Sequence, residues 1–259
     1  MDMSRHFRTL IIITWTVLAL AACSGSSFDA SSSTPSPSTP LTAEEIITRM
    51  QQAPLKDATF TEQVNSQTAG SAVGIPITVV ATVKGNGHLI THPKRVEVQL
   101  SGTVPESTFS AQNVIVDASG SYVQVSGDTH WSKTNSSGAT VSSVGPDLVL
   151  NYTQLQGATL VGSEIINGIA TWHLKGTPPI NTNIVVNGGV TNITNVSSST
   201  DVAATEDIWV RQDNYYPVKI EVQTTSNISA PSTTIHVAAN EHILFTAWDT
   251  GITISTPQE

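Results

Sequence analysis

Apolar and polar residues alternate in segments rich in valine, isoleucine and threonine from residue 57 onward, and this alternation most constrains the fold. In residues 96–100, for example, three apolar side chains alternate with two polar ones. Successive side chains of a strand point to opposite faces, so a period of two predicts strands with one buried face. Gly85 and Gly87 are predicted to loosen or turn the chain. Strands are predicted at residues 77–83, 88–90, 96–100, 113–116, 122–125, 159–165, 170–175, 206–211, 218–223, 233–237 and 242–246, about ten or eleven in all.

Two segments carry helical signals instead. Thr42 and Glu45 have the spacing of a capping box, in which each side chain bonds the other's backbone N–H. The helix that they open is predicted to end near Gln52, because Pro54 restricts the residue before it. Residues 146–155 have a proline near the first turn and an apolar repeat, which predicts a second helix.

The N-terminus has the three parts of an export signal. Arg5 and Arg8 form a short basic start, and an apolar run follows over residues 10–22. This run is shorter than the roughly 20 apolar residues of a membrane-spanning helix. Residues 20–23, Leu-Ala-Ala-Cys, match a lipobox, in which the cysteine thiol accepts a diacylglyceryl group before cleavage. Residues 1–22 are therefore predicted to be a lipoprotein signal peptide, and Cys23, the only cysteine, the site of lipid attachment.

The rest of the chain is predicted to contain a lipidated Ser/Pro-rich tether at residues 23–40 and one domain at residues 41–259. Residues 181–200 lack charge and are interpreted as a loop or hairpin inserted in that domain. Removal of the signal peptide takes away two basic residues and one acidic one, so the net charge changes from −9 to −10. This balance disfavours nucleic acid as a partner. The predicted contact with a membrane is therefore the lipid on Cys23.

No catalytic motif, phosphate loop or dinucleotide fingerprint is present, which predicts a protein that is not an enzyme and that has no cofactor. His88 and His92 could share one side of a strand and hold a metal, but ordinary surface histidines are the favoured interpretation, so no metal site is predicted. Glu206, Asp207 and Asp249 form no convincing catalytic pair. Core filling is favoured over carbohydrate stacking for the tryptophans that sit in or beside strands, Trp131, Trp172, Trp209 and Trp248.

Several segments together resemble LppX/LprG-type bacterial lipoproteins, which are relatives of the LolA and LolB lipoprotein carriers. The matching segments are residues 41–52, 161–168 with 171–174, 208–210 with 216–220, and 245–252 with Pro257. The resemblance implies an α+β fold that is mainly β: a strongly curved antiparallel sheet, or unclosed half-barrel, with a few helices on its concave side and an apolar cavity between them. It also implies that the cavity binds acyl chains or lipidated molecules, for carriage or transfer in the cell envelope.

The candidate lining of this cavity comes from the first helix and from two strands: Ile46, Met50, Ile77, Val79, Val83, Val96, Val98 and Leu100. Core packing is the alternative role for each of these residues. Two other functions remain open. The same sheet could bind another envelope protein, as a sensor or interaction module without lipid transfer, and an exported enzyme would need titratable side chains that converge from distant positions.

Overall fold

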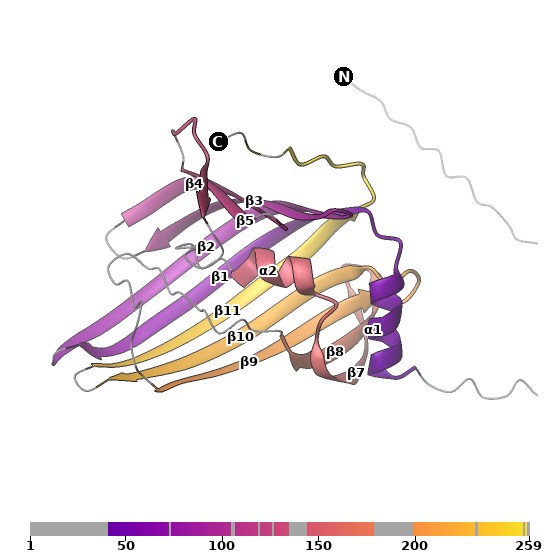
Figure 1. The fold of residues 1–259 in the computed structure, drawn as a ribbon. Coiled ribbons are helices and arrows are strands. Elements are labelled where there is room, and N and C mark those ends of the chain that lie inside the picture. Colours follow the sequence, from indigo (N-terminus) through magenta and orange to yellow (C-terminus); the bar gives the residue numbers. More distant parts are fainter. Residues whose placement is uncertain are drawn as a thin grey trace, which may run out of the picture. The chain divides into compact units, whose positions relative to one another are not determined.

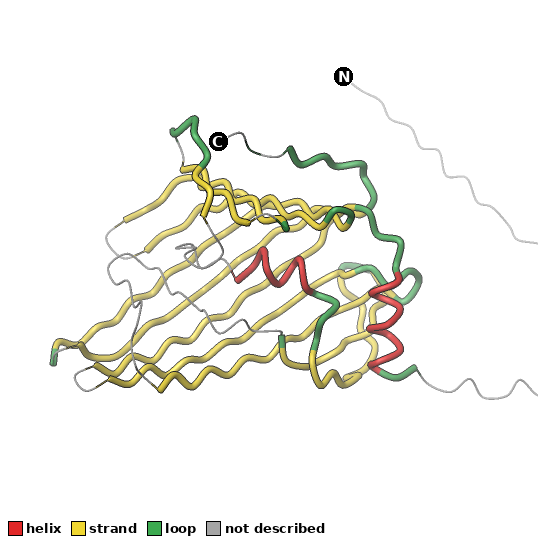
Figure 2. The backbone as a smooth tube through the Cα atoms, in the orientation of Figure 1, coloured by secondary structure: helices red, strands yellow, loops and turns green. Residues whose placement is uncertain are grey.

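The computed structural model describes residues 41–72, 74–104, 107–118, 120–125, 127–134, 144–178, 199–230, 233–255 and 257. The predicted signal peptide, Cys23, the tether and residues 181–198 of the predicted insert lie outside these residues. Leu41–Glu259 forms one compact unit. Its elements in chain order are α1 (Ala43–Gln52), β1 (Asp57–Ala72), β2 (Ile75–Thr91), β3 (Lys94–Val104), β4 (Ser107–Asp117), β5 (Gly120–Val125), β6 (Ser132–Thr134), α2 (Val144–Asn151), β7 (Gln156–Ile166), β8 (Ile169–Thr177), β9 (Ser199–Arg211), β10 (Pro217–Ala230) and β11 (Thr233–Trp248) (Figures 1 and 2).

These eleven strands form one antiparallel sheet in the order β6-β5-β4-β3-β2-β1-β11-β10-β9-β8-β7. The sheet curves strongly without closing, and α1 and α2 lie on its concave side (Figure 1). The predicted fold class is therefore confirmed. All neighbours in the sheet are also neighbours in the sequence except β1 and β11, the first and last strands, which pair from Ala58 and Trp248 to Ala72 and Thr233. Two strand meanders thus meet at a central seam.

A pair of aspartates strengthens this seam where β1 begins and β11 ends. The Asp57 carboxylate accepts hydrogen bonds from the backbone N–H groups of Thr250 and Gly251 at 2.8 and 3.0 Å. In return, the Asp249 carboxylate accepts from the N–H of Lys56 at 2.8 Å and from the hydroxyl of Tyr216 at 2.7 Å. Asp57 is 5% exposed, and its buried charge is satisfied by these donors.

Helix α1 begins and ends as its sequence predicts. The Thr42 hydroxyl accepts from the N–H of Glu45 at 3.2 Å, and the N–H of Thr42 donates to the Glu45 carboxylate at 2.8 Å, which completes the capping box. Helix α2 starts two residues before the predicted position and ends at Asn151. The Asn151 carbonyl accepts from the N–H of Gln154 at 2.8 Å, which turns the chain out of the helix before Leu155.

Strand β2 runs unbroken through Gly85 and Gly87, so these residues do not turn the chain as predicted. A Cβ atom at position 87 would lie 2.3 Å from Cζ of Phe60 and 2.7 Å from the backbone oxygen of Glu97. A Cβ atom at position 85 would lie 2.9 Å from Cδ2 of Leu100. The two glycines therefore leave room for core side chains that lie across the strand.

We expect Gly87→Ala to lower the free energy of unfolding by about 1–3 kcal/mol, because the added methyl group overpacks the core. Gly162→Ala is the matched control, because a Cβ atom at this strand position meets no atom within 4 Å. Adding Phe60→Leu to Gly87→Ala removes the atom nearest to the new methyl group, so the double variant should lose less stability than the sum of the single variants. Urea denaturation is measured for the wild-type chain, Gly87→Ala, Phe60→Leu, the double variant and Gly162→Ala, and equal stabilities of the two glycine variants would contradict this explanation.

Candidate functional site: the concave face of the sheet

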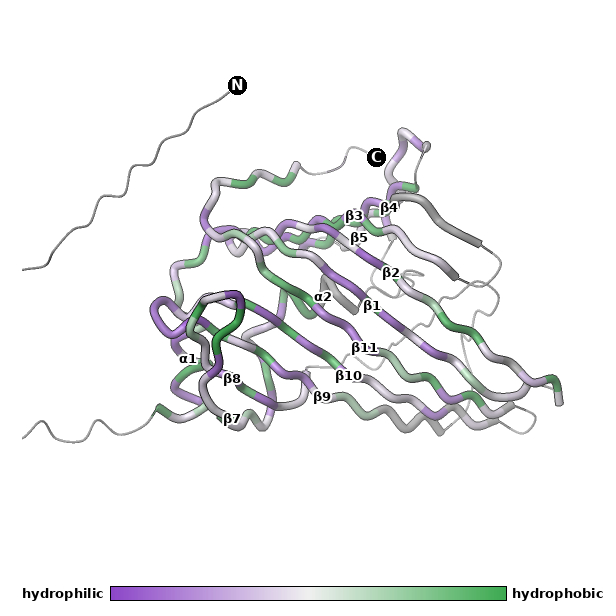
Figure 3. The backbone as a smooth tube through the Cα atoms, turned by 180° about the vertical axis from the view of Figure 1, so that it is seen from behind, coloured by the Kyte–Doolittle hydropathy of each residue, from purple (hydrophilic) through white to green (hydrophobic). Residues whose placement is uncertain are grey.

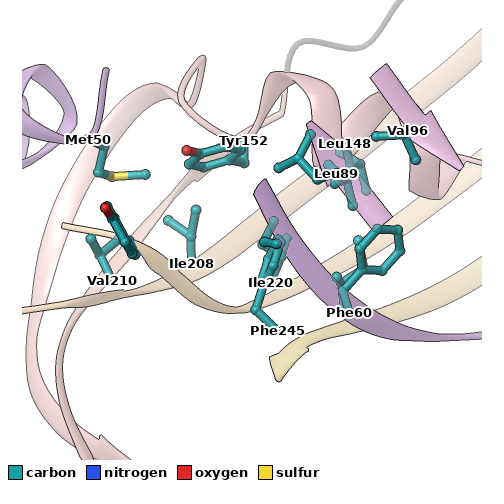
Figure 4. Close-up of a cluster of buried hydrophobic side chains, with 14 of the residues drawn as sticks. Met50, Phe60, Leu89, Val96, Leu148, Tyr152, Ile208, Val210, Ile220 and Phe245 are labelled. Carbon is teal, nitrogen blue, oxygen red and sulfur yellow. The ribbon is translucent and has the colours of Figure 1, made fainter. Parts of the chain in front are cut away.

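The concave face holds the core where the two helices cover it. Phe60 and Phe245 lie with ring centroids 5.9 Å apart, and the ring of Tyr152, just after α2, lies 6.5 Å from that of Phe245. Figure 4 shows these rings beside Met50 of α1 and aliphatic side chains of the sheet. The core contains residues from both meanders and from both helices, so it joins the two halves of the sheet.

The eight residues predicted to line a cavity divide into two groups. Most are 0–3% exposed and belong to this core, where helix and strand side chains pack on one another: Ile46, Met50, Val96, Val98 and Leu100. Val83 is half-buried and packs against the core, and Val79 is half-buried further along β2. Ile77 pairs with Gly70 of β1, and only its backbone is described. Contact of any of the eight with a ligand stays a prediction.

Beyond the core, side chains on the concave face form rows that cross the strands. Two adjoining rows, here called the distal rows, cross β2, β1, β11, β10 and β9. Ala239 of β11 lies in one of them and Val237 of β11 in the other. All their described side chains are small or medium-sized and uncharged: Ser66, Thr68, Val79, Ala81, Ala204, Thr224, Ser226, Val237 and Ala239. The helices lie over the other end of the strands (Figure 1).

The convex face has the opposite character over the same stretch. Its side chains are mostly polar and exposed, as in Gln67, Thr205, Gln223 and Asn240. Apolar and polar stretches are accordingly interspersed along the long strands (Figure 3). Apolar side chains stabilise a protein only when they are removed from water. A sheet with one more apolar face is therefore typical of a sheet that is covered on that face. The distal rows are therefore suited to contact with something apolar.

Three glutamates lie on the concave face between the core and the distal rows. Glu62 of β1, Glu206 of β9 and Glu241 of β11 are 3%, 1% and 4% exposed. Burial raises the pKa of Glu62 to about 7 and that of Glu206 to about 8. Burial, and then the charges of the other two glutamates, raise the pKa of Glu241 well above its usual value. Each carboxyl group has one buried oxygen without a hydrogen-bond partner.

A network of charged side chains lies on the convex face of β7, β8 and β9. The ring nitrogens of His173 lie 2.7 Å from Glu164 and 2.8 Å from Asp207, and the ring stacks on Trp209 at 4.3 Å. Trp209 donates to Glu164 at 2.9 Å, and this hydrogen bond and that from His173 lower the pKa of Glu164. Asp207 also accepts from Lys175 at 2.9 Å. Both ring nitrogens are occupied, so the network holds three strands together without offering a free base.

The other residues singled out in the sequence have ordinary surroundings. His88 lies 3.4 Å from the Thr59 hydroxyl, and His92 is exposed. No group of three or more potential ligands for a metal occurs within the described part of the chain. The tryptophans contribute to packing: Trp131, Trp172 and Trp248 pack against buried clusters, and Trp209 is itself 5% exposed. No described helix is long and apolar enough to cross a bilayer.

The fold and its two faces define a class of protein: an open antiparallel half-barrel with helices packed in part of its concave side. No protein-family model matches the chain, and no curated protein matches its sequence. Among solved structures, LppX from Mycobacterium tuberculosis matches with 16% identity and a TM-score of 0.40, over 82% of this chain and 100% of that one. LprF from Mycobacterium bovis matches with 15% identity and a TM-score of 0.38, over 84% and 99%. A LolA-superfamily protein from Nitrosomonas europaea matches with 12% identity and a TM-score of 0.28, over 83% and 96%.

These solved structures belong to the same groups of proteins, LppX-type and LolA-type, that the sequence motifs resemble. At such identities the likeness concerns the fold alone. A function for this chain has to be argued from its own residues.

Proposed function

We propose that this protein is a lipoprotein, anchored through Cys23, whose concave face binds an acyl chain of a lipid or lipidated molecule for carriage or transfer in the cell envelope. The observation that carries the proposal is the contrast between the two faces of the sheet beyond the core. The side chains of the distal rows are small and at least half-buried, whereas most convex-face side chains over the same stretch are polar.

The energetics of this contrast favour an apolar ligand. Each methylene group buried against such a face contributes about 0.8 kcal/mol, so an acyl chain binds without specific polar contacts. Small side chains such as Ala81, Ala204 and Ala239 leave more room above the sheet than leucine or phenylalanine would. A slender hydrocarbon chain fits this surface better than a bulky polar ligand does.

The predicted anchor agrees with this function. Two or three acyl chains on Cys23 hold a protein stably on a membrane, since a single chain gives only marginal binding. The tether at residues 23–40 contains little that could be buried and so predicts a flexible connection. The domain would then stay within reach of the bilayer from which a lipid is taken or to which it is delivered.

Replacing Cys23 with serine tests the anchor. In the native host, the wild-type chain should be recovered in the membrane fraction after a high-salt wash and should carry an N-terminal diacylglyceryl group by mass spectrometry. C23S should lack this group and remain unprocessed, because a serine hydroxyl does not accept the lipid. A wild-type chain without the lipid modification would contradict the anchor and would leave the test of the concave face unaffected.

The lipid-binding face is tested by organic extraction of the purified chain and mass spectrometry of the extract. We expect co-purified lipid in the parent chain (residues 23–259 with C23S), which retains every described element. Ala239→Asp should reduce the bound lipid at least about tenfold, because a carboxylate on the concave face would have to lose its water. Ala238→Asp places the same charge one residue away on the convex face and is the matched control.

Circular dichroism and thermal unfolding should show that both aspartate variants remain folded. Absence of lipid from the parent chain, with no uptake from lipid vesicles, would overturn the proposal. A parent chain free of lipid that instead binds a defined envelope protein through the concave face would favour the interaction module.

A further inference from the structure

Glu62, Glu206 and Glu241 stand out because they are the charged side chains among the described concave-face positions of β1, β2, β9, β10 and β11. Glu241 lies in one row with Glu206, separated by Val222, and Glu62 lies in the adjoining row. The charges of Glu62 and Glu206 both act on Glu241. The row of Glu241 and Glu206 adjoins the distal rows, because Ala239 and Ala204 lie two residues away along the same strands.

Packing alone does not explain three glutamates at these positions. A buried polar atom without a hydrogen-bond partner costs about 1–3 kcal/mol, and Oε2 of Glu62, Oε1 of Glu206 and Oε1 of Glu241 are all without one. No lysine, arginine or histidine occupies a described concave-face position on the strands around them. Lys84, Asp207 and His242 belong to the opposite face of the same strands, and the other titratable groups buried in the core are Tyr152, which follows α2, and Tyr216.

We propose that these three glutamates bind the primary ammonium group of an amphiphilic ligand whose hydrocarbon part lies on the distal rows. This inference rests on the proposed function and specifies the polar end of the ligand. A primary ammonium group has three N–H donors and no acceptor, so it can satisfy carboxyl oxygens that lack a hydrogen-bond partner, and its single positive charge balances one ionised carboxylate. A carboxylate ligand would be repelled, and a hydroxyl group would supply one donor and no charge.

Binding should release protons. Burial keeps Glu206 largely protonated at pH 7, since its pKa is raised to about 8. An ammonium group favours the ionised form of a nearby carboxyl group, so its arrival transfers protons from the glutamates to the buffer. The positive charge of the ammonium group then takes the place of the proton that a glutamate has released, so the net charge of the buried glutamates and the ligand together stays close to zero. A ligand that binds through its hydrocarbon chain alone releases none.

The test is isothermal titration calorimetry of the parent chain (residues 23–259 with C23S) with three ligands of equal chain length: dodecylamine and dodecanoate below their micelle concentrations, and 1-dodecanol below its solubility limit. Titration at pH 7 in two buffers of different ionisation enthalpy counts the protons released. We expect dodecylamine to bind at least about tenfold more tightly than the other two ligands, and to be the one that releases protons.

Glu206→Gln should bring the affinity for dodecylamine down about tenfold, towards that of 1-dodecanol, and should reduce proton release. Glu241→Gln provides a second, independent variant with the same expectation. Glu221→Gln is the matched control, because Glu221 pairs with Asp207 of β9 and His242 of β11 on the convex face. Its affinity should equal that of the parent chain.

The outcomes separate the two proposals. Equal affinity for the three ligands, or tighter binding of 1-dodecanol, would overturn the ammonium site while leaving the apolar face as the place where hydrocarbon binds. Dodecylamine binding that neither glutamine variant weakens would also overturn it. Failure of all three ligands to bind would count against the acyl-binding face itself, and the ammonium site with it.

Discussion

Phe245→Ala should lower the free energy of unfolding by about 3–5 kcal/mol, which is a large part of the stability of a domain of this size. Phe245 is 2% exposed and lies in β11, one of the two strands of the central seam, where its ring is tilted against Phe60 of β1 and against Tyr152, which follows α2. Alanine leaves a cavity where the two meanders and the second helix meet. The loss is therefore larger than the transfer free energy of the side chain alone.

Urea denaturation of the wild-type chain and three variants measures this effect. Phe245→Leu should cost less than Phe245→Ala, because leucine fills part of the same volume. Asn240→Ala removes an exposed side chain from the same strand and should change stability by no more than about 0.5 kcal/mol. A loss below about 1 kcal/mol for Phe245→Ala would show that the core is not organised around this ring.

The second large effect is a loss of stability as the pH rises from about 5 to about 8. The unfolded chain releases the protons of its glutamates near pH 4.5, whereas burial raises the pKa of Glu62 to about 7 and that of Glu206 to about 8. Across this window the folded state holds more protons than the unfolded state, so the free energy of unfolding falls as pH rises. For Glu62 alone the change is on the order of 3 kcal/mol.

Below this window the sign reverses. Hydrogen bonds from Trp209 and His173 lower the pKa of Glu164, so the stability that this carboxylate contributes is lost as pH falls through its folded pKa. Stability should therefore be greatest near pH 5. Glu206→Gln has no proton to lose, so its stability should fall less between pH 5 and 8 than that of the wild-type chain. Stability that rises steadily from pH 5 to 8 in the wild-type chain would contradict the burial of these glutamates.

Local signals in the sequence predicted most of the elements correctly. The capping box of Thr42 and Glu45 placed the start of α1, since both of its hydrogen bonds form within four residues of chain. Alternation predicted strands such as β3 and β10. It missed the full length of β11, which joins two predicted strands, because residues 238–241 between them, Ala-Ala-Asn-Glu, do not alternate between apolar and polar and yet continue the ladder between β1 and β10.

Signals that depend on distant contacts were harder to interpret. The turn predicted at the glycines of β2 is wrong because the sequence does not show that Phe60 lies across the strand from Gly87. The sequence does not reveal that Glu206 lies near Glu241 and Glu62, because this relation exists only in the register of four strands, β1, β11, β10 and β9. The ion pairs of His173 likewise join residues from three strands. Side-chain type alone predicts exposure for all of these groups.

The place of the seam in the sheet also determines when the protein can fold during its synthesis. Strand β1 is made first among the strands, but one of its two partners, β11, is the last to emerge. Until then each meander has an open edge, at β1 and at β10, and the core rings of Phe60 and Phe245 have not met. Contacts so far apart in the chain form slowly, and open strand edges invite pairing with other chains. A partly synthesised chain therefore lacks one of the two strands of the seam, and its two open edges would need protection by chaperones until β11 is complete.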